Sequence, residues 1–354
     1  MTQKFGICYI KSIFLQGDDY LKKREAWIDV LKGLALIWIF FVHYTNEYMK
    51  PIIDKIYYGK LSFIMKGFSG KFAVALFAVI LGYLAAKKAE KIVSVSNYIL
   101  KRYLQFAIPL LVVSTVTAIG LYAVAGIGTF KEQLVTILKE SLLFSGNSLC
   151  PPAWCLVNFL QASVIIVVTA NKKYTTYIQL LCVLVFYLCS GLFVWTACCI
   201  VGALLFRLQK YVLQNNEQKI VKLILNPIFK VILIALSILV IQRDEGPTTF
   251  LLDSFACCAV VFVILGSDSL KKILSIKPLA AFGRVSMEFF LIHVAAYTFV
   301  HWVMYKFIGE SMSAIGFYLV SMLVAFAASV AVSLAFNWLL KTKPFMLPYR
   351  LIED

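Results

Sequence analysis

Long apolar runs separated by short polar breaks recur along the chain from Ile28 to its C-terminal end. A helix needs about 20 consecutive apolar residues to cross the hydrocarbon core of a bilayer. The runs predict an all-α fold, a polytopic membrane helical bundle with about ten transmembrane helices. The predicted spans are residues 28–48, 68–86, 105–126, 153–170, 174–190, 192–208, 227–242, 249–266, 285–305 and 314–340. The fifth and sixth spans share one apolar stretch, which is interrupted mainly by Ser190 and Gly191.

The composition supports this interpretation. Of 354 residues, 61% are hydrophobic and 15% are charged, whereas a soluble domain carries about 25% charged residues. No compositional break divides the chain, so we expect one integral membrane domain over residues 27–341. A cytoplasmic segment (1–26) would precede it and a short cytoplasmic tail (342–354) would follow. The first 26 residues lack the uncharged apolar core of a cleavable signal, which predicts that the first helix is retained.

Lysine and arginine predict the orientation, because positively charged loops remain in the cytoplasm. With the N-terminus inside, 25 of these residues fall on the inner side and nine on the outer side. This distribution favours ten spans with both termini cytoplasmic. It also accounts for the net charge of +16, since basic inner loops contact anionic lipid headgroups. Membrane lipids are therefore expected partners, and nucleic acid is not.

The longest outer segment runs from about Ala125 to Pro152. Within it, KEQLVTILKESLLF has apolar residues at helical spacing, which predicts an interfacial helix. The tetrapeptide SGNS that follows is similar to serine-esterase motifs, but no catalytic histidine motif is near it, so we interpret it as a loop. Most of the nine cysteines lie within apolar runs and are expected to be free packing residues. Cys150 and Cys155 could pair in an oxidising compartment.

The first predicted helix carries most of the candidate chemistry. Ionisable groups are expensive inside a bilayer and are functional candidates by default. Lys32 and His43 are eleven residues apart, which places them within about 20° of the same helical face and about 16 Å apart along the axis. Asp29 can pair with Lys32 at i,i+3, and Glu47 can hydrogen-bond the His43 imidazole at i,i+4. Asn46 is the alternative partner for that imidazole.

The ninth predicted helix, FGRVSMEFFLIHVAAYTFVHW, supplies a second cluster. It contains Arg284 at its inner end, Glu288 and His293 deeper in the span, and His301 near the outer surface. Two interpretations of His293 remain open, a second site residue or a structural hydrogen-bond partner of Glu288. His301 is expected to be structural.

The first helix resembles that of the acyltransferase-3 family of integral membrane acyltransferases, whose hallmark is matched by Asp29, Lys32 and His43. Four further segments resemble family motifs in order: FSGKFAVALFAVILGYLAAKK, KRYLQFAIP, WCLVNFLQA and FGRVSMEFFLIH. The resemblance covers most of residues 24–300. Two departures are Lys32, where the family usually has arginine, and Gln105, where a second arginine is common. Lysine keeps the charge but lacks the bidentate fork that suits phosphate.

The resemblance implies an acyl-CoA-dependent O-acyltransferase in the bacterial inner or plasma membrane. The donor substrate would be acyl-CoA, with acetyl-CoA expected, and the acceptor a cell-envelope glycan or a lipid-linked sugar. No tightly bound cofactor and no metal are expected. The implied donor-binding residues are Lys32, Arg102, Asp29 and Arg284. The implied catalytic residues are His43, Glu47 and His293, with His43 taking a proton from the acceptor hydroxyl.

Other interpretations remain. Asp29 and Lys32 would also suit an ordinary ion pair at a membrane boundary, and His43 a helix-packing histidine. At the level of the whole chain, a transporter or flippase of lipid-linked sugars would also need many spans and buried charges. That class favours broken helices and internal repeats, and neither is evident. A glycan polymerase would need large outer loops, and the longest here is under thirty residues.

Overall fold

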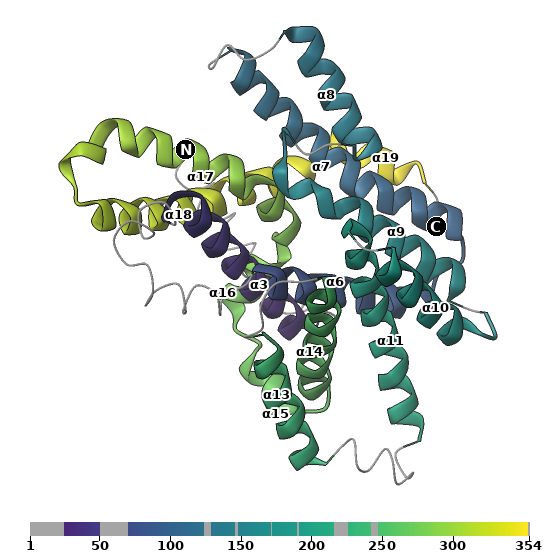
Figure 1. Cartoon of the computed structure of the whole chain (residues 1–354). Coiled ribbons are helices and arrows are strands. Elements are labelled where there is room, and N and C mark those ends of the chain that lie inside the picture. The colour runs from purple at the N-terminus through teal and green to yellow at the C-terminus, as the bar shows by residue number, and fades with distance from the viewer. Residues whose placement is uncertain are drawn as a thin grey trace, which may run out of the picture.

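The computed structural model is built from helices that pack side by side along much of their length (Figure 1). It describes residues 25–49, 70–123, 129–145, 148–170, 172–189, 191–215, 226–241 and 247–352. Across these ranges the chain forms helices and contains no strand. The all-α prediction is confirmed. The predicted N-terminal segment lies almost entirely outside the described residues.

Each predicted span coincides with a helix. These helices are α3 (Ala26–Tyr44), α6 (Gly70–Ala89), α7 (Val95–Ala123), α9 (Trp154–Thr169), α10 (Thr175–Leu188), α11 (Val194–Gln214), α13 (Pro227–Ile241), α14 (Pro247–Leu265), α17 (Ser286–Ile308) and α18 (Ala314–Leu340). Within the described residues, seven helices are long and apolar enough to cross a membrane, while α10, α13 and α14 contribute shorter apolar helices. The chain is a helical membrane bundle, and the number ten stays a prediction.

The uncertain boundary between the fifth and sixth spans is a real break. Helix α10 ends at Leu188, and a short 3₁₀ turn, η3 (Gly191–Phe193), precedes α11. Gly191 has φ +63°, a left-handed conformation that glycine adopts without steric cost. The chain reverses direction there, and α10 packs against α11.

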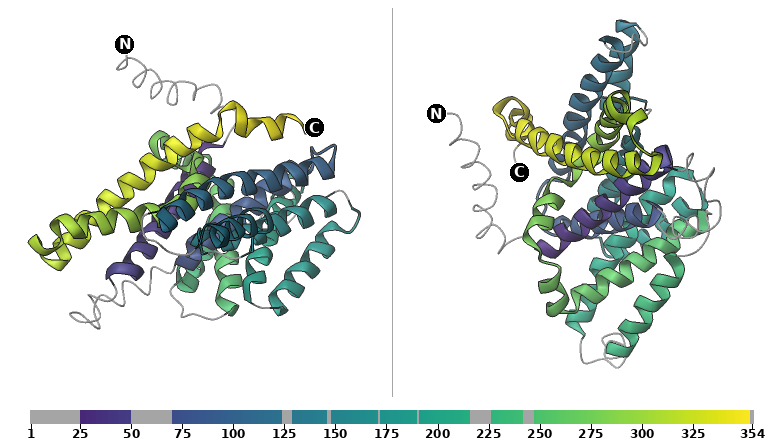
Figure 2. Two further views of the ribbon diagram at one scale, coloured as in Figure 1. Left: turned by 90° about the horizontal axis from the view of Figure 1, so that it is seen from above. Right: turned by 90° about the vertical axis from the view of Figure 1, so that its left-hand side faces the viewer.

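The predicted interfacial helix is α8 (Phe130–Leu143). Thr129 and Glu132 form a capping box at its start, with the Thr129 N–H donating to Glu132 at 2.8 Å. Helices α7 and α8 pack together and extend away from the other helices (Figures 1 and 2). Several apolar side chains of α8 are exposed, including Leu134 and Leu138. The helix is confirmed, and its position at a membrane interface stays a prediction.

Short helices gather at one end of the bundle, which we call the Lys32 end. They are α15 (Asp268–Ile273), α16 (Lys277–Arg284) and α19 (Lys343–Arg350). The segment expected to be a simple tail therefore contains a helix, and the Tyr349 hydroxyl donates to the Leu104 carbonyl of α7 at 3.0 Å. The start of α3 lies at the same end, because Gly283 of α16 contacts the Asp29 backbone of α3. Glu25, just before α3, also pairs with Lys87 at the end of α6. We call the opposite end the His43 end.

Glycines allow two helices in the middle of the bundle to touch through their backbones. A Cβ on Gly82 of α6 would lie 1.7 Å from the Cys199 carbonyl oxygen of α11. A Cβ on Gly202 of α11 would lie 2.0 Å from the Val79 carbonyl oxygen of α6. Close contact through small residues is typical of membrane helix packing. This contact fixes α6, which in turn packs against α3.

Candidate functional site

The site is built on α3, which packs against α6, α16 and α17. His43 lies in the last turn of α3, and His293 lies in α17. The Nδ1 atom of His43 is 3.2 Å from the Nε2 atom of His293, a hydrogen-bond distance. His293 is fully buried, whereas His43 is half-buried. The structure thus joins two histidines that are 250 residues apart in the sequence.

The surroundings of His293 determine which nitrogens carry protons. Its Nδ1 lies 2.9 Å from the Phe290 carbonyl oxygen and 3.2 Å from the Phe289 carbonyl oxygen. A carbonyl oxygen only accepts, so Nδ1 carries the hydrogen and Nε2 of the neutral ring is an acceptor. His43 must then donate from its own Nδ1. The Nε2 atom of His43 keeps a lone pair, and no described residue hydrogen-bonds to it.

Aromatic side chains surround this pair. Phe289 stacks on the His293 ring with centroids 5.7 Å apart and an interplanar angle of 4°. Phe40, one turn before His43, and Tyr297, one turn beyond His293, lie with ring centroids 6.5 Å and 6.0 Å from His293. All three are buried. The rings exclude water and hold the imidazole in one orientation, as an active site requires.

Glu47 does not orient His43 as the sequence predicted. After Tyr44 the helix continues as a π-helix, η1 (Thr45–Met49), whose hydrogen bonds run between residues five apart. The α-helical i,i+4 spacing therefore does not apply, and Asn46 and Glu47 are exposed. His293 takes the place that was expected for the carboxylate. The side chain of Thr45 anchors the π-helix through a 2.6 Å hydrogen bond to the Tyr318 hydroxyl of α18.

The alternative in which His293 hydrogen-bonds to Glu288 is also wrong. The Nδ1 atom of His293 already bonds to backbone carbonyl oxygens, and its Nε2 atom bonds to His43. Glu288 instead faces α18. When the Asn337 amide is turned to satisfy both neighbours, it donates to Glu288 at 3.2 Å and accepts from Lys341 at 3.2 Å. The charges of Lys341 and Lys32 both act on Glu288. Glu288 therefore belongs to the Lys32 end of the site.

Lys32 and Asp29 form the ion pair that their spacing predicted. The Lys32 ammonium is 2.7 Å from Asp29 Oδ1, and the two side chains are only 9% and 2% exposed. The spacing of Lys32 and His43 places both on one face of α3, where His43 contacts His293 of α17. With Glu288 and Lys341 nearby, two negative and two positive charges share this region. Lys32 is thus a buried, neutralised cation, and a phosphate would have to compete with Asp29 for it.

Gly283 explains the glycine of the FGRVS segment. A Cβ at Gly283 would lie 1.7 Å from the Asp29 carbonyl oxygen, and a Cβ at Gly33 would lie 2.9 Å from the Leu279 carbonyl oxygen. The backbones of α16 and α3 therefore touch at the residue that pairs with Lys32. Only glycine permits this approach, so Gly283 positions Asp29.

The two candidate arginines come from different elements. Arg102 lies in the second turn of α7, which begins ten residues before the predicted span. Its guanidinium donates to Gln105 at 3.1 Å and sits 4.6 Å over the Phe106 ring, while its Nε is buried and no described residue accepts from it. Arg284 ends α16 and is half-buried. Arg102 retains donor capacity that an anion would satisfy.

A buried glutamate that the sequence analysis did not single out stabilises a loop that contacts α17. Glu140 of α8 is 1% exposed and accepts from the Ser148 N–H and hydroxyl, both at 2.6 Å, and from the Leu149 N–H at 3.1 Å. The next residue, Cys150, donates to the Leu291 carbonyl at 3.4 Å. This loop therefore contacts α17 two residues before His293. The described end of SGNS lies in a loop, as predicted.

The Cys150 thiol beside α17 is not a nucleophile candidate. All eight cysteines within the described residues are free, including Cys150 and Cys155. Burial, with a smaller contribution from nearby Glu140, raises the pKa of the Cys150 thiol to about 12. The thiolate is the nucleophilic form, so Cys150 serves packing and hydrogen bonding.

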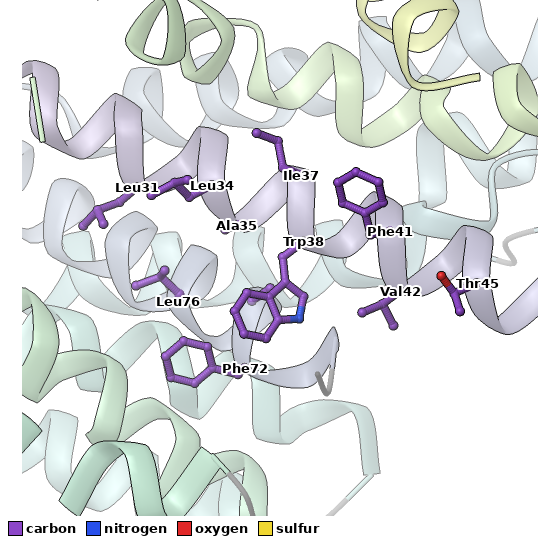
Figure 3. A pocket seen from close by; sticks show the side chains of 11 residues that line it. Leu31, Leu34, Ala35, Ile37, Trp38, Phe41, Val42, Thr45, Phe72 and Leu76 are labelled. Atoms are coloured by element: carbon purple, nitrogen blue, oxygen red, sulfur yellow. The ribbon is translucent and has the colours of Figure 1, made fainter. Parts of the chain in front are cut away.

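An apolar groove of about 520 Å³ lies between α3 and α6 (Figure 3). Trp38, Phe41 and Phe72 contribute its largest side chains. Trp38 precedes His43 by five residues, which turns it about 140° away on the helix. The groove therefore lies on the opposite face of α3 from the His43–His293 pair. It is a different cavity from the predicted groove that Lys32 and His43 would share.

Residues 25–340 match the family model of the acyltransferase domain of the acyltransferase-3 type. A search of curated proteins and a search of solved structures return no match.

Proposed function

The chain belongs to the acyltransferase-3 family, and on this basis we propose that it transfers an acyl group from acyl-CoA to a hydroxyl of a cell-envelope glycan. The observation that carries this proposal is the 3.2 Å bond between His43 Nδ1 and His293 Nε2. It leaves the half-buried His43 with an unprotonated Nε2. A neutral imidazole with a free nitrogen is the side chain best suited to accept a proton near neutral pH.

The reaction would proceed by direct transfer. An acceptor hydroxyl attacks the thioester carbonyl while His43 Nε2 takes its proton. The carbon–sulfur bond then breaks, the acceptor carries a new ester, and the departing thiolate takes the proton from His43 as free CoA thiol. His293 keeps the ring of His43 in the required tautomer, as the acidic member of a catalytic triad does. Because His293 is neutral, its contribution is orientation.

The donor would enter from the Lys32 end. Arg102 and Arg284 would hold its phosphates, since an arginine matches phosphate oxygens with a planar fork of donors. Lys32 and Asp29 lie along the path between that end and His43. The pantetheine arm spans roughly 15 to 20 Å, which matches the axial offset of about 16 Å between Lys32 and His43. We expect an acetyl group.

The acceptor would reach His43 from the other end. Asn46 and Glu47 are exposed there, immediately beyond His43. Amide and carboxylate groups bind sugar hydroxyls through hydrogen bonds. A glycan or a lipid-linked sugar at the outer face of the cell membrane, the bacterial inner or plasma membrane, fits this position.

Purified protein in liposomes tests the proposal. With acetyl-CoA as donor, thiol release should be measurable for the wild type. We expect His43→Ala to lower kcat by about 10²- to 10⁴-fold and to leave acetyl-CoA binding intact. Leu34→Ala changes an exposed residue on the other face of α3 and serves as the matched control. If His43→Ala turns over acetyl-CoA like the wild type, the proposed enzyme activity is wrong.

A further inference from the structure

His301 belongs to a directional chain of hydrogen bonds at the His43 end. The Ser321 hydroxyl donates to the Tyr318 carbonyl at 3.1 Å, and the Tyr44 hydroxyl donates to Ser321 at 2.7 Å. The Tyr44 oxygen lies 2.9 Å from His301 Nδ1. Tyr44 has only one hydroxyl hydrogen and has given it to Ser321, so it must accept from His301. Nδ1 of His301 therefore carries the hydrogen, and Nε2 is an acceptor.

Aromatic contacts fix the orientation of this ring. Tyr48 stacks on His301 with centroids 3.6 Å apart and an interplanar angle of 13°. Phe317 contacts the ring edge-on at 5.3 Å and 74°. Tyr48 comes from the π-helix η1, and its hydroxyl hydrogen-bonds to Thr298 of α17. The imidazole is thus held in place.

The Nε2 atom of His301 has no hydrogen-bond partner among the described residues, and the side chain is half-exposed. Packing and the Nδ1 bond have already determined its direction. An atom that is oriented in this way pays little entropy on binding a ligand. If His301 were only structural, the bond from Nδ1 to Tyr44 would be sufficient. The fixed orientation of Nε2 would then have no role in the fold.

We propose that His301 is an acceptor-binding residue, whose Nε2 accepts a hydrogen bond from a hydroxyl of the acceptor next to the hydroxyl that is acylated. This inference rests on the proposed function. Tyr44, which bonds to His301, directly follows His43 in the chain. His43 and His301, each with a free Nε2 lone pair, therefore lie at the same end of the bundle.

The chemistry of this end selects a polyhydroxylated acceptor. A nitrogen with only a lone pair accepts from hydroxyl donors and repels carboxylate oxygens. The half-buried ring of Tyr48, which stacks on His301, supplies apolar surface for the C–H face of a sugar. A few polar groups among aromatic rings are typical of small-molecule sites.

Nitrogen-15 NMR on histidine-labelled protein in liposomes tests the tautomer directly. The chain has three histidines, and His301→Phe identifies the His301 signals by their loss. We expect a protonated Nδ1 and an unprotonated Nε2, with Nε2 shifting when methyl α-D-glucopyranoside is added. A protonated Nε2, or a signal that the sugar does not move, would overturn the proposal. This measurement requires no enzyme turnover.

Kinetics with methyl α-D-glucopyranoside as acceptor separates binding from structure. His301→Phe keeps a ring against Tyr48 and should raise the acceptor KM about threefold to tenfold, the effect of one lost hydrogen bond. The loss should appear in the acceptor KM rather than in kcat. His301→Gln should recover part of the KM through its amide oxygen. Trp302→Phe, at an adjacent exposed residue, is the control.

An unchanged KM in His301→Phe, or a loss confined to kcat and thermal stability, would assign His301 to structure and contradict the proposal. Absence of acetyl-CoA turnover in the wild type would instead remove the proposed function itself. The two failures are therefore distinguishable.

Discussion

At the scale of single residues, the buried ion pair changes the role that Lys32 can play. Its ammonium contacts Asp29 at 2.7 Å, and both side chains are nearly inaccessible. Removing one member of a buried pair leaves an uncompensated charge and costs about 3–5 kcal/mol. Lys32 therefore contributes to stability as well as to the proposed donor path.

We predict that Lys32→Ala lowers the unfolding temperature and weakens acetyl-CoA binding. The double variant Asp29→Asn, Lys32→Met removes both charges, so it should unfold at a higher temperature than either single variant. Thermal unfolding in detergent and equilibrium dialysis with labelled acetyl-CoA measure the two effects. A double variant with wild-type donor affinity would exclude Lys32 from donor binding while leaving its structural role intact.

The sequence predicted part of the site. Local spacing placed Asp29 beside Lys32 and placed Lys32 and His43 on one helical face, because α-helical periodicity determines both. The bond between His43 and His293 was not predictable, since it depends on how two distant helices pack. The predicted hydrogen bond between Glu47 and His43 was wrong because a π-helix begins after Tyr44. No local sequence pattern predicted that change of helix type.

At the scale of helices, the contact of α16 with α3 depends on a glycine. A Cβ at Gly283 would overlap the Asp29 carbonyl, 1.7 Å away. We predict that Gly283→Ala separates these helices, lowers the unfolding temperature and reduces acetyl-CoA turnover at least about tenfold, since small misplacements cost large factors in rate.

Gly120 of α7 offers a matched control, because a Cβ there would meet no atom within 4 Å. Gly120→Ala should be neutral or stabilising by up to about 1 kcal/mol, as alanine favours helices over glycine. Thermal unfolding and turnover assays of both variants make the comparison. Equal unfolding temperatures and equal turnover in the two variants would mean that the α3–α16 contact contributes to neither stability nor activity.

Apolar runs predicted the helices well but not their ends. Helix α7 starts at Val95, ten residues before the predicted span, because SNYILKRYLQ is helical without being uniformly apolar. Helix α19 was missed because it is only eight residues long, is polar on one face and contains two prolines. Hydropathy detects burial in lipid, whereas the first ten residues of α7 extend an apolar helix and α19 packs on α7.

At the scale of the whole molecule, the start of α3 and helix α19 lie at the same end of the bundle, and the excess of lysine and arginine predicts that this end is cytoplasmic. We predict that a fluorescent protein fused after residue 354 is fluorescent and that alkaline phosphatase fused there is inactive. Phosphatase fused after Met312, between α17 and α18, should be active. The reverse pattern would invert the orientation and place the donor path on the wrong side.

The most direct test of the central claim is a double-mutant cycle on acetyl-CoA turnover by purified protein. His43→Gln should abolish most of kcat, and His293→Gln should lower it about 10- to 100-fold, because a buried residue that orients a functional side chain has effects of this size. If His293 acts only through His43, the double variant should be no slower than His43→Gln within about twofold. Independent, multiplying losses, or a His293→Gln enzyme with wild-type kcat, would contradict the account.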